Sequence, residues 1–335
     1  MGIRDLWPQV KEAKQECNID NLKENFGINT VAVDANIVIS QFYRGAWSTL
    51  SRDSKPSTDE CFSITQARLS SFATNFRNLG IDLIWCFDGD KTTEKIATGQ
   101  RILDHNERVG KLVALWTAAE AKAVLEEDRE AMAPYADIMR SHATTAKAAI
   151  GDNTDVANDG VFRQLFNDFV SKLQWCPLFP PSMNDILLRD MNTRGHRCLR
   201  VPAISEAEKL ASVVCHLGAA QAVYGDDSDY IALQTPMIIK DISKRVAEVY
   251  VFSDIVRVLG VPPDRLFTMC VILGNDFNTR VRLHGPVKAK KLAMDDKFSL
   301  DAFENQHGKE IVQLANCKRF LTISDSDLAI VRACM

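Results

Sequence analysis

Short apolar runs and amphipathic stretches alternate through the first ninety residues. Apolar runs at residues 30–34 and 82–88 are short and rich in β-branched or aromatic side chains, which predicts two buried strands. Apolar positions recur at helical spacing in residues 35–45 and 63–79, and a polar loop is expected between them at residues 51–59. The predicted order in this region is therefore strand, helix, loop, helix, strand.

The same alternation returns after residue 196. One helix is predicted at residues 206–217. Strands are predicted at residues 197–201, 219–224, 237–240 and 248–252. Strands that alternate with helices are typical of parallel pairing, so the expected fold class is α/β, with a central, mainly parallel sheet and helices on both faces.

Residues 91–150 have a different composition, dominated by Ala, Glu, Lys and Arg. Strand formers are few there and residues 113–132 have high helix propensity, so a helical insertion is expected. Two forms of it stay open, a helical hairpin packed on the core or a mobile element. After a polar break, residues 161–175 predict an amphipathic helix whose aromatic stripe belongs to the core.

The last part of the chain, from residue 253 onward, is predicted to be helical. Breaks are expected at residues 260–263 and 284–286, where Gly and Pro cluster. We expect a single domain with an N-terminal region, a helical insertion, an internal region and a C-terminal helical region. Their predicted limits are residues 1–90, 91–155, 156–252 and 253–335.

Composition excludes several classes of protein. The 335 residues contain no apolar run of about twenty and do not start with a charged-then-apolar leader, so neither a membrane span nor secretion is expected. The nine cysteines occur singly and form no C-x-x-C pair. This pattern favours free thiols in a reducing compartment over disulfides or a zinc site.

The net charge of −4 argues against a nucleic-acid partner, because proteins that bind phosphates usually carry a basic surface. One stretch, at residues 278–291, nevertheless contains cations and no acid. Its cations are Arg280, Arg282, Lys288, Lys290 and Lys291. Local charge governs such binding more than the total does, so a nucleic acid stays an expected partner.

Carboxylates gather where the predicted strands and helices end or begin. They are Asp34, Asp88, Glu206, Glu208, Asp227, Asp229 and Asp276. Crowded carboxylates repel one another unless a cation lies among them, and hard oxygen donors are what Mg²⁺ or Mn²⁺ prefers. Sites in α/β folds form at the carboxyl ends of strands, so the set predicts a divalent-metal site.

Each acid alone has a simpler interpretation. Ser205 and Glu208 fit a helix capping box with Ser205 as the capping residue. The other acids lie in sequences typical of turns. Glu206 and Glu208 converge only if a helix begins there, because positions i and i+2 do not share a helix face. The metal site is favoured by the complete set rather than by any one member.

Six segments, in this order, resemble the motifs of the flap endonuclease and xeroderma-pigmentosum-G-type structure-specific 5′ nucleases. They are residues 1–8, 31–36, 86–89, 205–208, 226–229 and 273–276. The resemblance runs from residue 1 to about residue 293 and extends to viral members of the family. It implies that the seven carboxylates are the metal ligands, that the cofactor is two Mg²⁺ ions with Mn²⁺ as a substitute, and that the fold carries a helical arch and a C-terminal helix–turn–helix region.

Hydrolysis of a phosphodiester needs an activated water and a stabilised leaving oxygen, which two divalent ions roughly 4 Å apart can supply. The resemblance also implies a lysine and an arginine in the arch that contact the scissile phosphate. These positions fall on Lys95 and, with a one-residue shift, on Arg101. The alternative is that both are solvated helix cations.

The resemblance further implies contacts with DNA, and here the chain departs from the family pattern twice. The base-stacking aromatic position falls on Ser40, so Phe42 or Tyr43 must substitute or the contact is absent. In the duplex clasp, Leu283 replaces the first glycine and Val287 precedes Lys288, which removes part of the pattern for a monovalent-cation site. The expected DNA-binding residues are Gly2, Phe42, Tyr43, Arg280, Arg282, Gly285, Lys288, Lys290 and Lys291.

The expected function is a metal-dependent 5′ nuclease for flapped or branched DNA in replication, repair or recombination, with 5′ exonuclease activity. It would act in the nucleus or at a cytoplasmic replication site. Two alternatives stay open, an RNA-cleaving enzyme of the herpesvirus shutoff type and a non-catalytic nucleic-acid-binding scaffold, although a scaffold has no reason to keep seven carboxylates. The C-terminus shows no sliding-clamp peptide, so clamp binding is not expected.

Overall fold

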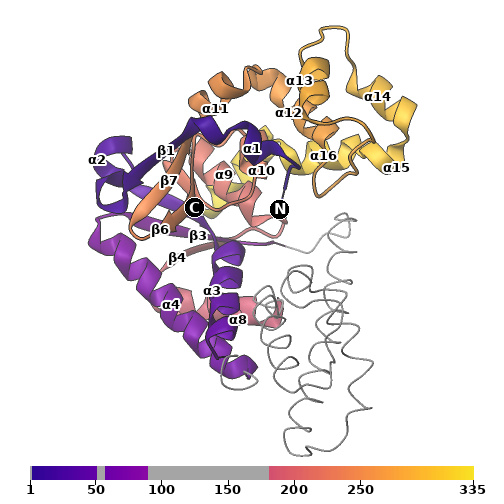
Figure 1. Cartoon of the computed structure of the whole chain (residues 1–335). Coiled ribbons are helices and arrows are strands. Elements are labelled where there is room, and N and C mark those ends of the chain that lie inside the picture. Colours follow the sequence, from indigo (N-terminus) through magenta and orange to yellow (C-terminus); the bar gives the residue numbers. More distant parts are fainter. Residues whose placement is uncertain (1, 51–56, 90–180) are drawn as a thin grey trace, which may run out of the picture. The chain divides into compact units, whose positions relative to one another are not determined.

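The structure is a computed structural model that describes residues 2–50, 57–89 and 181–335. These residues form a seven-stranded sheet in the order β1-β7-β6-β5-β2-β3-β4 (Figure 1). The strands are β1 (Lys14–Asn18), β2 (Thr30–Asp34), β3 (Asp82–Phe87), β4 (Arg197–Arg200), β5 (Ala222–Tyr224), β6 (Met237–Ser243) and β7 (Val246–Val251).

Pairing is parallel from β6 through β5, β2 and β3 to β4, whereas β7 pairs antiparallel with β6 and with β1. The predicted α/β fold with a mainly parallel sheet is therefore confirmed. Five of its predicted strands correspond to β2, β3, β4, β5 and β6, and the sixth to β7. Each contains at least one buried apolar residue, and β2, β3 and β5 are largely buried, which explains why their apolar pattern predicts strands.

Some helices precede β7, and all of these except α1 connect strands, whereas the other helices follow β7 and extend to residue 334. The former are α1 (Leu6–Gln9), α2 (Leu22–Phe26), α3 (Ala35–Leu50), α4 (Thr58–Asn78), α8 (Pro181–Thr193), α9 (Ala207–His216) and α10 (Asp229–Ala232). The latter are α11 (Phe252–Leu259), α12 (Pro263–Leu273), α13 (Pro286–Ala293), α14 (Leu300–His307), α15 (Lys309–Val312), α16 (Leu314–Leu321) and α17 (Asp325–Cys334). The predicted helical C-terminal region, with breaks before α12 and before α13, is confirmed. The predicted helical insertion and the helix at residues 161–175 lie outside the described residues.

Two helices cover opposite faces of the sheet. Ala32, Ile84 and Val223 share one hydrophobic core with the buried side of α9. Alternate side chains point the other way, where the ring of Phe72 on α4 contacts Trp85 and Tyr224 at centroid distances of 5.8 and 5.2 Å. The period-two alternation of strand side chains thus gives the central strands β2, β3 and β5 two buried faces.

Several described elements were not predicted from the sequence, namely the edge strand β1, the helix α8 and the short helices α1, α2 and α10. Strand β1 is polar and half-exposed, so it has no apolar run to detect. The antiparallel turn from β6 to β7 also lacked a signal, because Lys244 and Arg245 both take positive φ, 49° and 68°, where Gly and Asn are usual.

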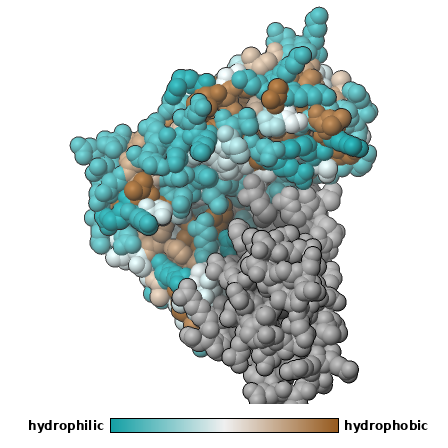
Figure 2. All heavy atoms as spheres, viewed as in Figure 1, coloured by the Kyte–Doolittle hydropathy of each residue, from teal (hydrophilic) through white to brown (hydrophobic). Residues whose placement is uncertain are grey.

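The chain divides into two compact units. The first contains residues 1–39, 69–101 and 180–335, and the second contains residues 40–68 and 102–179. Within the described part of the chain, no helix is both long and apolar enough to cross a membrane. The visible face of these residues is mainly hydrophilic, with apolar side chains in isolated patches (Figure 2).

Candidate metal centre

Asp34 is the last residue of β2 and Asp88 directly follows the neighbouring parallel strand β3, so both acids lie at the same edge of the sheet. Asp34 is 1% exposed and its Oδ1 accepts the Ile37 N–H at 3.1 Å. Asp88 is exposed, and its Oδ1 accepts the Ala207 N–H at 2.9 Å, at the beginning of α9. The parallel register therefore brings two acids together that are more than fifty residues apart in sequence.

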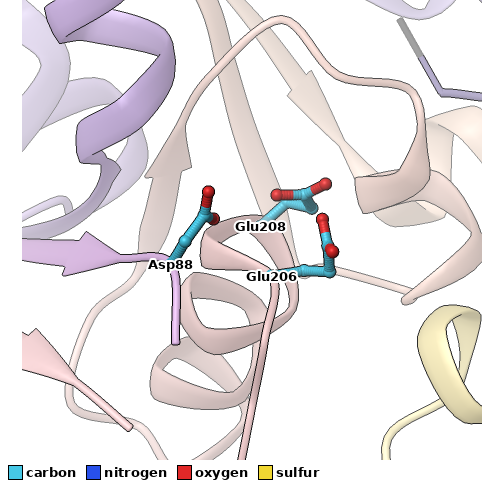
Figure 3. A group of neighbouring side chains, drawn as sticks. All are labelled: Asp88, Glu206 and Glu208. Atoms are coloured by element: carbon cyan, nitrogen blue, oxygen red, sulfur yellow. The ribbon is translucent and has the colours of Figure 1, made fainter. Parts of the chain in front are cut away.

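Glu206 and Glu208 come to the same place because α9 begins between them. Glu206 is the N-cap residue, with extended backbone, and Glu208 lies in the first helical turn. Side-chain oxygens of Asp88, Glu206 and Glu208 all lie within 4.8 Å of one another (Figure 3). The sequence condition for their convergence is met, and the alternative with Ser205 as capping residue is wrong.

Asp227 and Asp229 are brought together by a turn rather than by a strand. Strand β5 ends at Tyr224 and α10 begins at Asp229, so neither acid belongs to the strand that precedes them. The Asp229 N–H donates to Asp227 Oδ1 at 3.0 Å, and both side chains are buried. The backbone hydrogen bond folds the turn so that the two carboxylates lie near each other.

The N-terminal segment contacts the loops that carry Asp227, Asp229 and Asp276. Ser228 Oγ donates to the Ile3 carbonyl at 3.0 Å, and the Arg4 N–H donates to the Gly274 carbonyl at 3.0 Å. Gly2 has φ +66°, and a Cβ there would collide with Asp227 Oδ1 and lie 2.7 Å from Asp229 Oδ1. A glycine is required because the backbone itself approaches both carboxylates.

The loop after α12 holds Asp276, which is buried, through its neighbours. The Asn275 N–H donates to Asn278 Oδ1 at 2.8 Å, and the Phe277 N–H donates to Asn275 Oδ1 at 2.9 Å. The ring of Phe277 stacks on Phe320 of α16, with centroids 4.2 Å apart and planes within 9°. Helix α16 thus fixes the loop from which Asp276 projects.

The electrostatics of the group are those of crowded acids. Burial, then the charge of Asp88 and, less strongly, the charge of Asp227 raise the pKa of Asp34 to about 8, against the hydrogen bond from Ile37. Burial also raises the pKa of Tyr230 well above its ordinary value, with additional contributions from Asp34 and Glu208. The Asp34 carboxylate is therefore within electrostatic range of both Asp88, which follows β3, and Asp227, which precedes α10.

The raised pKa of Asp34 predicts how stability depends on pH when metal is absent. Between about pH 4 and pH 8 the folded protein holds a proton on Asp34 that the unfolded chain has lost, so the free energy of unfolding should fall as pH rises. For this one group the fall approaches roughly 1.4 kcal/mol per pH unit. Mg²⁺ should reduce it, because a cation favours the ionised carboxylate.

Urea unfolding in chelator at about pH 5.5 and about pH 7.5 measures this dependence. Asp34→Asn should remove most of it, whereas Asp226→Asn should retain it, because Asp226 is exposed in the same region of the sequence. Equal pH dependence in the parent and in Asp34→Asn would contradict the electrostatic assignment.

Lys209 is a residue of this region that the sequence did not single out. It follows Glu208 on α9 and is buried, and its Nζ donates to the Arg319 carbonyl at 2.7 Å and pairs with Asp327 Oδ2 at 2.9 Å. The Lys209 ammonium therefore links α16 and α17 to α9, the helix at whose beginning Glu206 and Glu208 lie. The available signal was a lysine within the otherwise uncharged run 209–215 of α9.

The remaining predicted site residues lie in several places. Lys95 and Arg101 are outside the described residues. Tyr43 is 1% exposed and packs with Ala46 and Cys61, so its ring offers no face to a base, and Phe42, which is half-buried, is the aromatic candidate that remains.

The predicted basic residues fall into two groups. Arg280 is engaged within the protein, because its Nη2 pairs with Asp5 at 2.7 Å and its Nε donates to the Leu273 carbonyl at 2.6 Å. Gly285 is the N-cap residue of α13. The exposed cations at this turn and helix are Arg282, Lys288, Lys290 and Lys291.

Comparison with known proteins identifies the family. The model of the XPG N-terminal domain matches residues 1–108, and that of the XPG I-region matches residues 199–276. Together the two cover more than half of the chain. The chain belongs to the XPG and flap endonuclease family.

Relatives of this family align over most of the chain. Flap endonuclease 1 of Naegleria gruberi is 25% identical over 304 residues, which are 89% of this chain and 65% of the relative. Flap endonuclease 1-1 of Paramecium tetraurelia is 21% identical over 303 residues, with the same two shares. A RAD2-like endonuclease of Frog virus 3 is 23% identical over 300 residues, 87% of this chain and 75% of the relative. The chain thus spans less than two thirds of the length of the first two.

Solved structures of the family share the fold. The catalytic core of Rad2 in complex with DNA substrate has a TM-score of 0.53 at 15% identity and covers 100% of this chain and 86% of its own. Flap endonuclease-1 from Methanococcus jannaschii has a TM-score of 0.53 at 16% identity, with 93% and 84% covered. At this identity the likeness concerns the α/β fold.

Proposed function

We propose that this protein is a divalent-metal-dependent, structure-specific 5′ nuclease that cleaves flapped or branched DNA. The observation that carries the proposal is the convergence of Asp88, Glu206 and Glu208 at the carboxyl edge of the parallel strands, with Asp34 in electrostatic contact with Asp88 and with Asp227. Four chain segments far apart in sequence contribute these acids. Packing of a sheet does not require such a group, because mutually repelling carboxylates cost stability.

The donor set fits hard divalent cations. All the donors are carboxylate oxygens, which suits Mg²⁺ or Mn²⁺ better than zinc or copper. Burial and the charge of Asp88 raise the pKa of Asp34, and a bound cation would oppose the repulsion between the two carboxylates. Asp88, Glu206 and Glu208 would hold one ion, and Asp34, Asp227, Asp229 and Asp276 would complete a two-ion site.

Bound divalent ions would supply an activated water and neutralise charge on the attacking and leaving oxygens of the phosphodiester. The protein's own residues prepare that chemistry. The Ala207 N–H orients the Asp88 carboxylate, and the backbone of Gly2 packs against Asp227 and Asp229 without a side chain to displace them. Asp34 must release its proton for a cation to bind beside it.

DNA as the substrate is supported by the family and by the basic turn before α13. Relatives are flap endonucleases by name, and the Rad2 core was solved with a DNA substrate. We extend the proposal to a 5′ exonuclease activity at nicked ends and to action in replication or repair, in the nucleus or at a cytoplasmic replication site.

One assay tests the proposal. End-labelled 5′-flap DNA, nicked duplex and structured RNA are incubated side by side with Mg²⁺ and with chelator. We expect cleavage of flap DNA near the branch in Mg²⁺, slower removal of 5′ ends at nicks, and no cleavage in chelator. Cleavage of RNA in preference to flap DNA, or cleavage that survives chelator, would contradict the proposal.

Lys95→Ala separates a structure-specific nuclease from a general metal hydrolase. A cation above the scissile phosphate stabilises charge that grows in the transition state, so its loss should lower the single-turnover rate by about 10²-fold or more with little change in affinity. Arg101→Ala should act in the same direction. Lys91→Ala, a nearby lysine with no proposed role, serves as the control and should cleave at the parental rate. If Lys95→Ala cleaves flap DNA at the parental rate, Lys95 does not stabilise the transition state, and the proposed role of the arch in catalysis is wrong.

A further inference from the structure

Two large apolar side chains project from one turn of the protein. Leu283 is 83% exposed and Val287 is 86% exposed, far more than any other large apolar side chain that the structure describes. They lie four residues apart on either side of the Gly285-Pro286 step that leads into α13. Side chains this exposed contribute almost no buried apolar area to the stability of the fold.

The backbone at Leu283 is strained as well as exposed. Its φ is +64°, a left-handed conformation that a side chain with a Cβ disfavours and that glycine adopts freely. The fold gains no packing from the leucine, because its side chain is in solvent. A residue that is both strained and exposed points to a function outside the fold.

The turn that presents these two side chains is firmly anchored. His284, between them, is buried, and its ring lies 5.4 Å from Phe303 and 5.5 Å from His307, measured between centroids. Its Nδ1 lies 3.0 Å from the Arg282 carbonyl. The protein therefore holds Leu283 and Val287 outward on a rigid support.

The charge around the pair identifies the kind of partner. Arg282, Lys288 and Lys291 are exposed, and residues 279–294 contain no acid. Lys291 follows Val287 by one helical turn and so shares its face of α13. The Lys290 side chain lies against Gly260 instead. Its Nζ is 3.2 Å from the position that a Cβ on Gly260 would occupy.

An apolar tip between cations fits the minor groove of duplex DNA, where sugar edges lie between two lines of phosphates. Proteins that enter this groove use apolar side chains as wedges and cations on the flanking phosphates. We propose that Leu283 and Val287 enter the minor groove of the duplex beside the cleavage site, with Arg282, Lys288 and Lys291 on the phosphates. This inference rests on duplex DNA being the substrate, as proposed above.

Salt dependence separates an apolar contact from an ionic one. Binding of a labelled 5′-flap duplex is measured by fluorescence anisotropy over a range of KCl concentrations, with metal replaced by Ca²⁺ to prevent cleavage. Leu283→Gly/Val287→Gln should weaken binding about tenfold at every salt concentration and leave the slope of log K against log [KCl] unchanged. Lys288→Gln/Lys291→Gln should lower that slope by about two.

Two controls keep the test specific. Ile186→Gln removes another exposed apolar side chain, on α8, and should bind at the parental affinity. Leu283→Gly relieves the strained backbone, so its melting temperature should equal or exceed that of the parent, which excludes misfolding as the cause of weaker binding. If Leu283→Gly/Val287→Gln binds the duplex with parental affinity, the two apolar side chains do not contribute to DNA binding. That result would contradict this inference but not the proposed nuclease activity. Failure of the parent itself to bind duplex at low salt would overturn both.

Discussion

Asp229→Ala is expected to abolish metal-dependent cleavage and leave the binding of flap DNA intact or tighter. Removing an anionic ligand weakens the hold on the cation, but it removes no cationic contact to phosphate. Changes to outer-shell partners of a metal already cost about 10–100-fold, so loss of a direct ligand should lower the cleavage rate by more than about 100-fold. Single-turnover cleavage and calorimetric titration with Mn²⁺ measure the two effects.

Asp226→Ala is the matched control for this change. It removes the same charge three residues earlier in the same turn, but its side chain is exposed. We expect parental cleavage and parental Mn²⁺ affinity in this control. Cleavage near the parental rate by Asp229→Ala would contradict its assignment as a metal ligand. Equal losses of cleavage rate and Mn²⁺ affinity in Asp229→Ala and Asp226→Ala would indicate that the total charge of the turn matters rather than metal coordination.

Lys209→Met is expected to lower the free energy of unfolding by about 3–5 kcal/mol, as is typical when one partner of a buried ion pair is removed. The side chains of Lys209 and Asp327 are 9% and 15% exposed, and the ammonium also binds the Arg319 carbonyl. The variant leaves Asp327 charged and largely out of water. Because α9 carries Glu206 and Glu208, Mn²⁺ affinity should fall in the same variant.

The dependence of the free energy of unfolding on pH at acid values provides a second test of the Lys209–Asp327 pair. Burial acts to raise the pKa of Asp327, but hydrogen bonds from Ser324 and Lys209 outweigh it and hold the pKa below its ordinary value. The stabilisation is therefore present above about pH 4 and is lost as pH falls through the lowered pKa. The difference in stability between parent and Lys209→Met should shrink accordingly below about pH 4.

An exposed ion pair of similar length is the control. Arg257 and Asp254 on α11 lie 2.8 Å apart, but the arginine is 71% exposed, so Arg257→Met should cost less than about 1 kcal/mol. Lys209→Met/Asp327→Leu should recover much of the lost stability, because no unpaired buried charge remains. A loss in Lys209→Met no larger than that in Arg257→Met would contradict the role given to the buried pair.

The elements that the sequence predicted are those that bury their side chains in a regular pattern. Strands β2 and β3 are apolar on both faces because helices cover both, and the acids at their ends stand out against that background. Helix α9 was predicted with its beginning close to Ala207, which decided that Glu206 and Glu208 converge. Strand β1 was missed because an edge strand exposed to water needs no apolar run.

Contacts between distant segments were decided by the tertiary structure. Ile3 and Ser228 are joined across 225 residues, and no local pattern in either segment indicates that Gly2 packs against Asp227 and Asp229. The burial of Tyr43 depends likewise on its packing with Cys61 of another helix, which made a candidate stacking residue part of a hydrophobic cluster.

The sequence by itself determined the fold class, the order of those strands and helices that bury a regular apolar pattern, and the identity of the acids that gather at the strand ends, because local periodicity follows from burial. The tertiary structure alone decided which atoms meet. The carboxylates of Asp88, Glu206 and Glu208 come within 4.8 Å through the parallel register of the strands, and Lys209 turns to Asp327 rather than to the neighbouring Glu208. Such choices depend on the docking of whole elements, which no short stretch of sequence specifies.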